Sequence, residues 1–135
     1  MTDRSFVHIL LRKLTDYYLS LMDAYLSSAG DYMQMIEMAD DIGIQIGHVI
    51  SPKLYEEIIL PYYKELLNLV KSKTKAKVFH HSCGSVIKMA PLLLEAGIDI
   101  LNSLQPRAYM VDSTYLKDNY GDKLSFHGGD VWKSE

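Results

Sequence analysis

The sequence predicts an α/β fold of the TIM-barrel type, because helical and strand patterns alternate and polar residues gather where the predicted strands end. Helix and strand follow one another four times, which indicates right-handed crossovers and a parallel sheet buried on both faces. A doubly wound sheet has the same alternation, but the Gly-x-Gly-x-x-Gly motif of a Rossmann unit is missing after the first strand. A complete barrel takes about 250 residues and eight strands. The 135 residues therefore predict about half a barrel.

The first predicted elements are a long helix and a strand. Over residues 3–28, apolar side chains recur at spacings of three and four and form one stripe of an amphipathic helix. The stripe comprises Phe6, Ile9, Leu10, Leu14, Tyr17, Leu21 and Tyr25. Gly30 is expected to end this helix in the left-handed conformation. Alternating side chains over residues 32–43 then indicate a strand that runs into Asp40 and Asp41.

The rest of the chain continues the alternation. Residues 50–73 predict a helix with Ser51 as N-cap and Pro52 at its first position, and Pro61 is expected to kink or split it. The later elements follow from β-branched runs, apolar periodicity and glycine stops. They are a strand at 76–84, a helix at 85–97, a strand at 98–106, a helix at 112–121 and a strand at 123–130.

Composition predicts a single globular domain over residues 1–135, with 48% hydrophobic and 23% charged residues. A net charge of -3 without a basic stripe argues against a nucleic-acid partner. No apolar run approaches the roughly 20 residues that span a bilayer, so no membrane association is expected. One cysteine suits a reducing compartment, and the absence of a signal-peptide pattern favours a cytoplasmic protein.

The stretch FHHSCGS, residues 79–85, carries the main chemical signal. On a strand, His81 and Cys83 share one face and His80 lies on the other. Imidazole nitrogen and thiolate are zinc ligands, and a catalytic zinc site normally has three protein ligands and one open position. Spacing alone leaves the third ligand open among His127, Asp41, Glu37 and His48. A buried cysteine beside a hydrogen-bonded histidine, or a papain-like Cys and His pair, is an alternative interpretation.

Three further residues are candidate substrate contacts because they follow predicted strands. Only one of Asp40 and Asp41 can face the barrel mouth, and we assign Asp41 to substrate binding, although an Asx turn explains the pair equally well. Gln105 is expected to donate a hydrogen bond to a ligand or to cap the loop before Pro106. His127 precedes two glycines, which suits either a close ligand approach or a turn.

Several of these motifs together resemble the later part of the uroporphyrinogen decarboxylase superfamily. The likeness extends without a gap from ADDIG, at residues 39–43, through HHSCG and LNSLQP to FHGGD at residues 126–130. The first predicted helix also suits this superfamily. The resemblance implies a TIM barrel, of which this chain covers the middle to late half.

The superfamily also contains cobalamin-dependent methyltransferases, and the His-x-Cys-Gly motif resembles that branch. The resemblance implies that His81 and Cys83 are zinc ligands, with a later cysteine as the third. Cys83 is the only cysteine here, so the third ligand is expected beyond Glu135 or to be replaced. The implied reaction moves a methyl group between a corrinoid, carried by a partner protein, and a small-molecule acceptor.

Two other functions remain open at this stage. The first is a metal-free uroporphyrinogen decarboxylase of porphyrin biosynthesis, which the broader family likeness suggests. The second is a noncatalytic half-barrel that assembles as a homo-oligomer or with the remainder of a barrel, since four parallel strands leave two edges unpaired.

Overall fold

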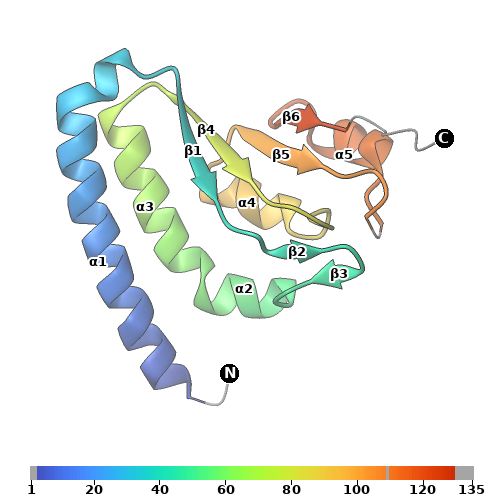
Figure 1. Cartoon of the computed structure of the whole chain (residues 1–135), viewed down its shortest axis with the longest axis horizontal. Coiled ribbons are helices and arrows are strands. Elements are labelled where there is room, and N and C mark those ends of the chain that lie inside the picture. Colours follow the sequence, from blue (N-terminus) through green and yellow to red (C-terminus); the bar gives the residue numbers. More distant parts are fainter. Residues whose placement is uncertain (1–2, 109, 130–135) are drawn as a thin grey trace.

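A computed structural model of the chain describes residues 3–108 and 110–129. Helices and strands alternate over most of this length (Figure 1), in good agreement with the predicted order. The elements are α1 (Arg4–Ala29), the 3₁₀ turn η1 (Gly30–Tyr32), β1 (Met35–Ala39), β2 (Gly43–Ile44), β3 (Gly47–His48), α2 (Pro52–Ile58), α3 (Leu60–Lys73), β4 (Lys77–His81), α4 (Ala90–Ala96), β5 (Ile100–Leu104), α5 (Ser113–Tyr120) and β6 (Ser125–Gly128).

The principal sheet is parallel and has the strand order β1-β4-β5-β6, so the predicted α/β class with a parallel sheet is confirmed. Within the described residues β1 and β6 each have a neighbour on one side only, and the sheet is open. The register aligns Ala39 with His81 and His81 with Asn102. Three successive strands therefore place their carboxyl ends side by side.

Local sequence signals explain most element boundaries. The hydroxyl of Ser51 caps α2 by accepting from the amide of Leu54, and Pro61 lies in the first turn of α3, where the predicted helix is split. Gly97 ends α4 in the left-handed conformation, with φ 109°. The left-handed cap predicted at Gly30 is wrong. Gly30 has a right-handed backbone conformation, with φ -57°, and begins the short turn η1.

Two further departures lie near the strand ends. The helix expected over residues 85–97 begins only at Ala90, since residues 87–89 form a turn and the Ser85 amide donates to the main-chain oxygen of Ile44 in the second sheet at 3.0 Å. That second sheet is the antiparallel pair β2 and β3, which the sequence did not predict. Each of its strands has two residues, too few to show a period-two pattern.

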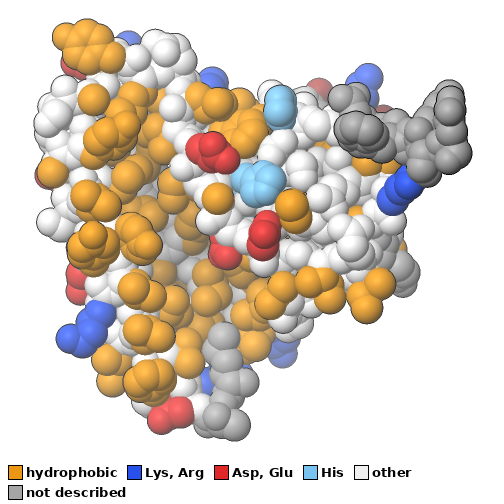
Figure 2. Space-filling view, in the orientation of Figure 1, with side chains coloured by type: hydrophobic (Ala, Val, Ile, Leu, Met, Phe, Trp, Pro, Cys, Tyr) orange, Lys and Arg blue, Asp and Glu red, His pale blue; other side chains and the backbone are white. Residues whose placement is uncertain are grey.

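The apolar stripe of α1 lies on the surface instead of in the core. Helix α1 packs along α3 (Figure 1), yet the seven stripe residues are 45–63% exposed, and Figure 2 shows apolar side chains over this flank. Leu26 is the only apolar α1 side chain among the buried core residues. The stripe was correctly predicted as a pattern, but most of it contacts no core among the described residues. No described helix has both the length and the apolar character needed to cross a membrane.

Asp99 joins the amino-terminal ends of the strands, opposite the candidate site. Its Oδ2 accepts from the amide of Val78 at 2.9 Å and from Lys71 at 3.1 Å, and its main-chain oxygen accepts from Ser125 at 2.9 Å. Partial burial by itself raises the pKa of Asp99, but the Val78 amide, Lys71 and Lys77 outweigh it and hold the pKa below its ordinary value.

Asp99→Asn is expected to lower the free energy of unfolding by about 1 kcal/mol at pH 7, because the ionised carboxylate is lost. A carboxyl with a depressed folded-state pKa contributes stability above its unfolded pKa and loses that contribution as pH falls through the folded pKa. The difference from the unsubstituted protein should therefore shrink below about pH 4. Urea unfolding at pH 7 and pH 3, with Asp122→Asn as an exposed control, measures it. An equal difference at both pH values would contradict the assignment.

Candidate functional site

The site lies at the carboxyl end of β4, where alternate side chains separate to opposite faces. His81 and Cys83 share one face as predicted, with the His81 Nε2 3.6 Å from the Cys83 Sγ, and both are partly exposed. His80 lies on the other face, fully buried, with its Nδ1 2.8 Å from the Tyr63 hydroxyl. Burial, and then the neighbouring His81, lowers the pKa of His80 to about 4, so this ring is neutral at pH 7.

Asp41 completes a cluster of three potential ligands with His81 and Cys83. Its Oδ1 lies 4.0 Å from the His81 Nε2 and accepts from the Cys83 amide at 2.8 Å. One ligand atom from each of the three residues lies within 4.8 Å of the others. Figure 2 shows histidine and acidic side chains gathered on this exposed face of the molecule. The sulfur, nitrogen and oxygen donors thus converge on one accessible point.

The spacing of these donors suits a small metal ion. Zinc bonds of about 2.0–2.3 Å in a tetrahedral arrangement place ligand atoms about 3.5 Å apart. The pair of His81 and Cys83 already has this separation, and the pair of His81 and Asp41 is wider by only a fraction of an ångström. Because Asp41 Oδ1 accepts the hydrogen bond from the Cys83 amide, the second carboxylate oxygen is available as a metal ligand. Two of the three donor pairs therefore have separations close to those of zinc ligands.

Asn102 lies beside this cluster, directly opposite His81 in the register of β4 and β5. Its Oδ1 is 2.5 Å from the His81 Nδ1, and its Nδ2 is 2.7 Å from the His127 Nδ1. The His127 ring packs edge-on against Phe79, with ring centroids 5.4 Å apart. Asn102 therefore connects His81, a candidate metal ligand, to His127, an exposed candidate substrate contact.

Gln105 supports the loop that carries Cys83. Its Oε1 accepts from the Gly84 amide at 3.1 Å and from the Gln45 Nε2 at 2.6 Å. These bonds make Gln105 a link between β5, the Cys83 loop and the turn between β2 and β3. Among the described residues, the side chain thus bonds to the Cys83 loop and to Gln45, and not to the loop before Pro106 that it was expected to cap; a ligand contact remains a prediction.

Two other residues considered as a third ligand lie outside the cluster. Glu37 belongs to β1, where it is paired with Phe79, two residues before His81 along the same face. His48 belongs to β3, and burial and then Lys88 lower its pKa. Among the described residues, the three-ligand cluster contains neither of them and does not contain His127.

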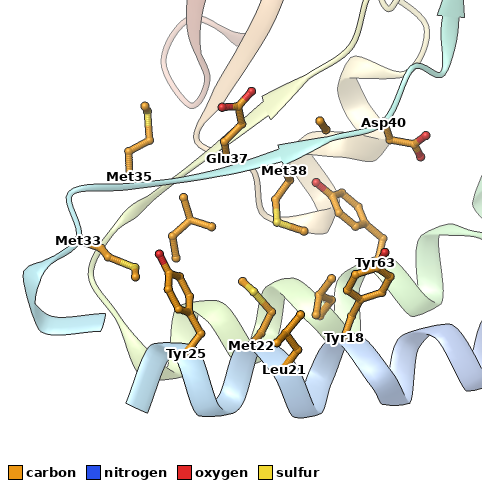
Figure 3. A pocket seen from close by; sticks show the side chains of 13 residues that line it. Tyr18, Leu21, Met22, Tyr25, Met33, Met35, Glu37, Met38, Asp40 and Tyr63 are labelled. Atoms are coloured by element: carbon orange, nitrogen blue, oxygen red, sulfur yellow. The ribbon is translucent and has the colours of Figure 1, made fainter. Parts of the chain in front are cut away.

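A cavity lies between β1 and the helices α1 and α3. It has a volume of about 590 Å³, and its lining includes Tyr18, Met22, Met38 and Tyr63. Figure 3 shows Met38 and Tyr63 in the space between strand and helices, whereas Glu37 points from β1 to the opposite side. This cavity is mainly apolar, although the acidic residues Glu37 and Asp40 are among those that line it. We therefore place the candidate chemistry at the strand ends.

A sequence model of the family described as uroporphyrinogen decarboxylase (URO-D) matches residues 1–124, which is most of the chain. The chain belongs to the uroporphyrinogen decarboxylase family. The resemblance inferred from the motifs is therefore confirmed at the level of this family. No curated protein and no solved structure matched the chain.

Sequence reasoning named most of the site but missed how the uroporphyrinogen decarboxylase family scaffold holds it together. Ser82 is fully buried, and its hydroxyl accepts from the Ile42 amide at 3.2 Å and donates to the main-chain oxygen of Cys83 at 3.2 Å. The hydrogen bonds of Asn102 to two histidines were likewise not predicted from the sequence. Their roles depend on strand register, which links residues 20 to 40 positions apart and leaves no local sequence pattern.

Gly84→Ala tests the packing that supports the Cys83 loop. Gly84 has φ +76°, and a Cβ there would lie 2.6 Å from the backbone of Gly43 and Ile44. We expect a loss of about 2 kcal/mol or more in the free energy of unfolding, measured by urea denaturation. Gly47→Ala is the matched control, because its Cβ would meet nothing within 4 Å. Equal unfolding free energies for the two variants would refute the close approach.

Proposed function

We propose that the chain is part of a zinc-dependent methyltransferase of the uroporphyrinogen decarboxylase family, which moves a methyl group between a corrinoid protein and a small-molecule acceptor. The single observation that carries this proposal is the convergence of Asp41, His81 and Cys83 within 4.8 Å. A metal-free decarboxylase has no need for a thiol, an imidazole and a carboxylate at zinc-like separations. The His-x-Cys-Gly motif, which resembles the methyltransferase branch, points the same way.

Asp41, His81 and Cys83 would hold the ion, with Asp41 in the place of the later cysteine that the resemblance implies as third ligand. When bound there, zinc supplies Lewis acidity that favours the deprotonated form of an acceptor such as a thiol. A neutral imidazole with one thiolate and one carboxylate balances the charge of a divalent ion. The uncharged ligand and the open fourth position suit a catalytic site better than a closed structural one.

The remaining residues bind and orient. His127 is exposed beside the cluster and suits contact with an acceptor, and Gln105 holds the Cys83 loop through the Gly84 amide. The corrinoid would belong to a partner protein that approaches the carboxyl ends of the strands, where active sites of TIM-barrel enzymes are built. We place this reaction in the cytoplasm, since a free cysteine ligand is best preserved in a reducing compartment.

A decarboxylase is the second candidate, favoured by the description of the matching family. In that function Asp41 acts as a polar group for the substrate, and Cys83 is a partly exposed side chain without a chemical role. The two candidates differ in what they require of the thiol. Metal uptake therefore separates them before any activity is known.

Cys83→Ser is expected to weaken zinc binding by at least about 100-fold, because a hard hydroxyl replaces a thiolate. The chain, stripped of metal and loaded with zinc, should carry close to one ion by elemental analysis, and competition with a chromogenic chelator gives the affinity. His81→Gln should cause a similar loss, whereas His8→Gln, on the exposed surface of α1, is the matched control and should retain zinc.

The opposite results favour the decarboxylase. Folded protein that takes up no zinc, or a Cys83→Ser variant that binds zinc as tightly as His8→Gln does, removes the methyltransferase proposal. Folding of each variant is checked by circular dichroism, so that loss of metal is not confused with loss of structure.

A further inference from the structure

The side chain of Asn102 makes hydrogen-bonding contacts to two histidines that lie on different strands. His81 is on β4 and His127 is on β6, and Asn102 stands between them on β5. The contacts are 2.5 Å to the His81 Nδ1, 2.7 Å to the His127 Nδ1 and 3.2 Å to the His127 main-chain oxygen. A carboxamide has two donor hydrogens and one acceptor oxygen, so these contacts constrain where each proton lies.

The main-chain contact determines the orientation of the amide. A carbonyl oxygen only accepts, so the end of Asn102 that faces the His127 oxygen must be the NH₂ group. Its two hydrogens then serve the His127 oxygen and the His127 Nδ1. The carbonyl Oδ1 is left facing the His81 Nδ1. The orientation thus follows from hydrogen-bond chemistry and does not depend on telling oxygen from nitrogen by position.

We propose that Asn102 is a positioning residue that holds His81 as its Nδ1–H tautomer and His127 as its Nε2–H tautomer. The Asn102 Oδ1 can only accept, so the His81 Nδ1 must donate, and in a neutral ring the Nε2 keeps its lone pair. That lone pair is on the nitrogen nearest the Cys83 Sγ and the Asp41 Oδ1. His127 accepts at Nδ1 and keeps its hydrogen on Nε2.

The backbone holds Asn102 in place for this role. The Ser82 amide donates to the Asn102 main-chain oxygen at 2.6 Å, and the Ser103 amide donates to the Ser82 oxygen at 3.2 Å. On the far side, the edge-on contact with Phe79 restricts the His127 ring. The backbone of Asn102 is therefore held by groups outside the pair of histidines, and the bond to the His127 main-chain oxygen fixes the orientation of the carboxamide.

The bond from the His81 Nδ1 to Asn102 would have a role if His81 binds a metal ion. A metal-binding histidine donates its other ring N–H to an outer partner, which sets the tautomer and raises the basicity of the ligand nitrogen. Asn102 has that relation to His81. This consequence for zinc rests on the proposed function, whereas the placement of the two protons does not. The Nε2–H of His127 in turn presents a hydrogen-bond donor to an acceptor molecule, which suits an anionic or carbonyl oxygen.

The test is a long-range ¹H–¹⁵N correlation spectrum of the ¹⁵N-histidine-labelled, metal-free 135-residue chain at about pH 8.5, above the ordinary titration range of histidine. His81 should give the Nδ1–H pattern and His127 the Nε2–H pattern. Most neutral histidines in water favour Nε2–H, so the His81 pattern is the informative one. An Nε2–H pattern for His81 overturns the inference.

Two substitutions separate positioning from simple packing. Asn102→Asp keeps an acceptor for His81 but loses the donor for His127, so His81 should remain Nδ1–H while the His127 pattern changes. Asn102→Leu removes both functions, and His81 should shift toward Nε2–H. Asn68→Leu, an exposed asparagine on α3, is the matched control and should leave both patterns unchanged. Unchanged His81 signals in folded Asn102→Leu would overturn the role.

Zinc titration of the same variants keeps the two hypotheses distinguishable. Asn102→Leu should weaken zinc binding by about 10- to 100-fold, and Asn102→Asp by much less. Zinc binding by a chain whose His81 is Nε2–H would overturn the positioning role and leave the proposed function standing. The expected tautomers without any zinc binding would support the positioning role and remove the proposed function.

Discussion

The parallel pairing of β4 between β1 and β5 is the constraint on which the rest of the site depends. It aligns Ala39, His81 and Asn102 across three strands, each at or near its carboxyl end. Because side chains alternate along a strand, this single register puts His81, Cys83 and Asn102 on one face. A slip of one residue would turn the imidazole and the thiol toward the helices and bring His80 to the exposed side.

The loop after β4 depends on close backbone packing. Gly43 and Gly84 approach so closely that a Cβ on either would lie within 2.7 Å of main-chain atoms, and the hairpin of β2 and β3 closes over this contact. Asp41 and Ser82 then bond across the same junction, to the Cys83 and Ile42 amides. The Asp41 carboxylate therefore contacts Cys83 in two ways. It accepts a hydrogen bond from the Cys83 amide, which stabilises the loop, and one of its oxygens lies within 4.8 Å of the Cys83 Sγ.

The buried side of β4 has a different chemistry from the exposed side. His80 is neutral and bonded to Tyr63 beneath the sheet, and desolvation, followed by Tyr55 and Asp40, raises the pKa of the Tyr63 hydroxyl. Neighbouring residues in one sequence motif therefore have unrelated roles, one in the core and one at the rim. The chain belongs to the uroporphyrinogen decarboxylase family, but a family fold does not by itself define a reaction. The proposal of methyl transfer therefore rests on the side chains of Asp41, His81 and Cys83 at the ends of the strands.

The sequence by itself determined the α/β class, the order of the principal elements, the split at Pro61, the stop at Gly97 and the family. These features depend on periodicity, caps and motifs that neighbouring residues carry. It also placed His81 and Cys83 on one face. Only the tertiary structure decided that Asp41 joins them, that Asn102 connects His81 to His127, and that the apolar stripe of α1 is exposed. Each of these depends on which strands and helices become neighbours, and contacts between residues so far apart in the chain have no local signature.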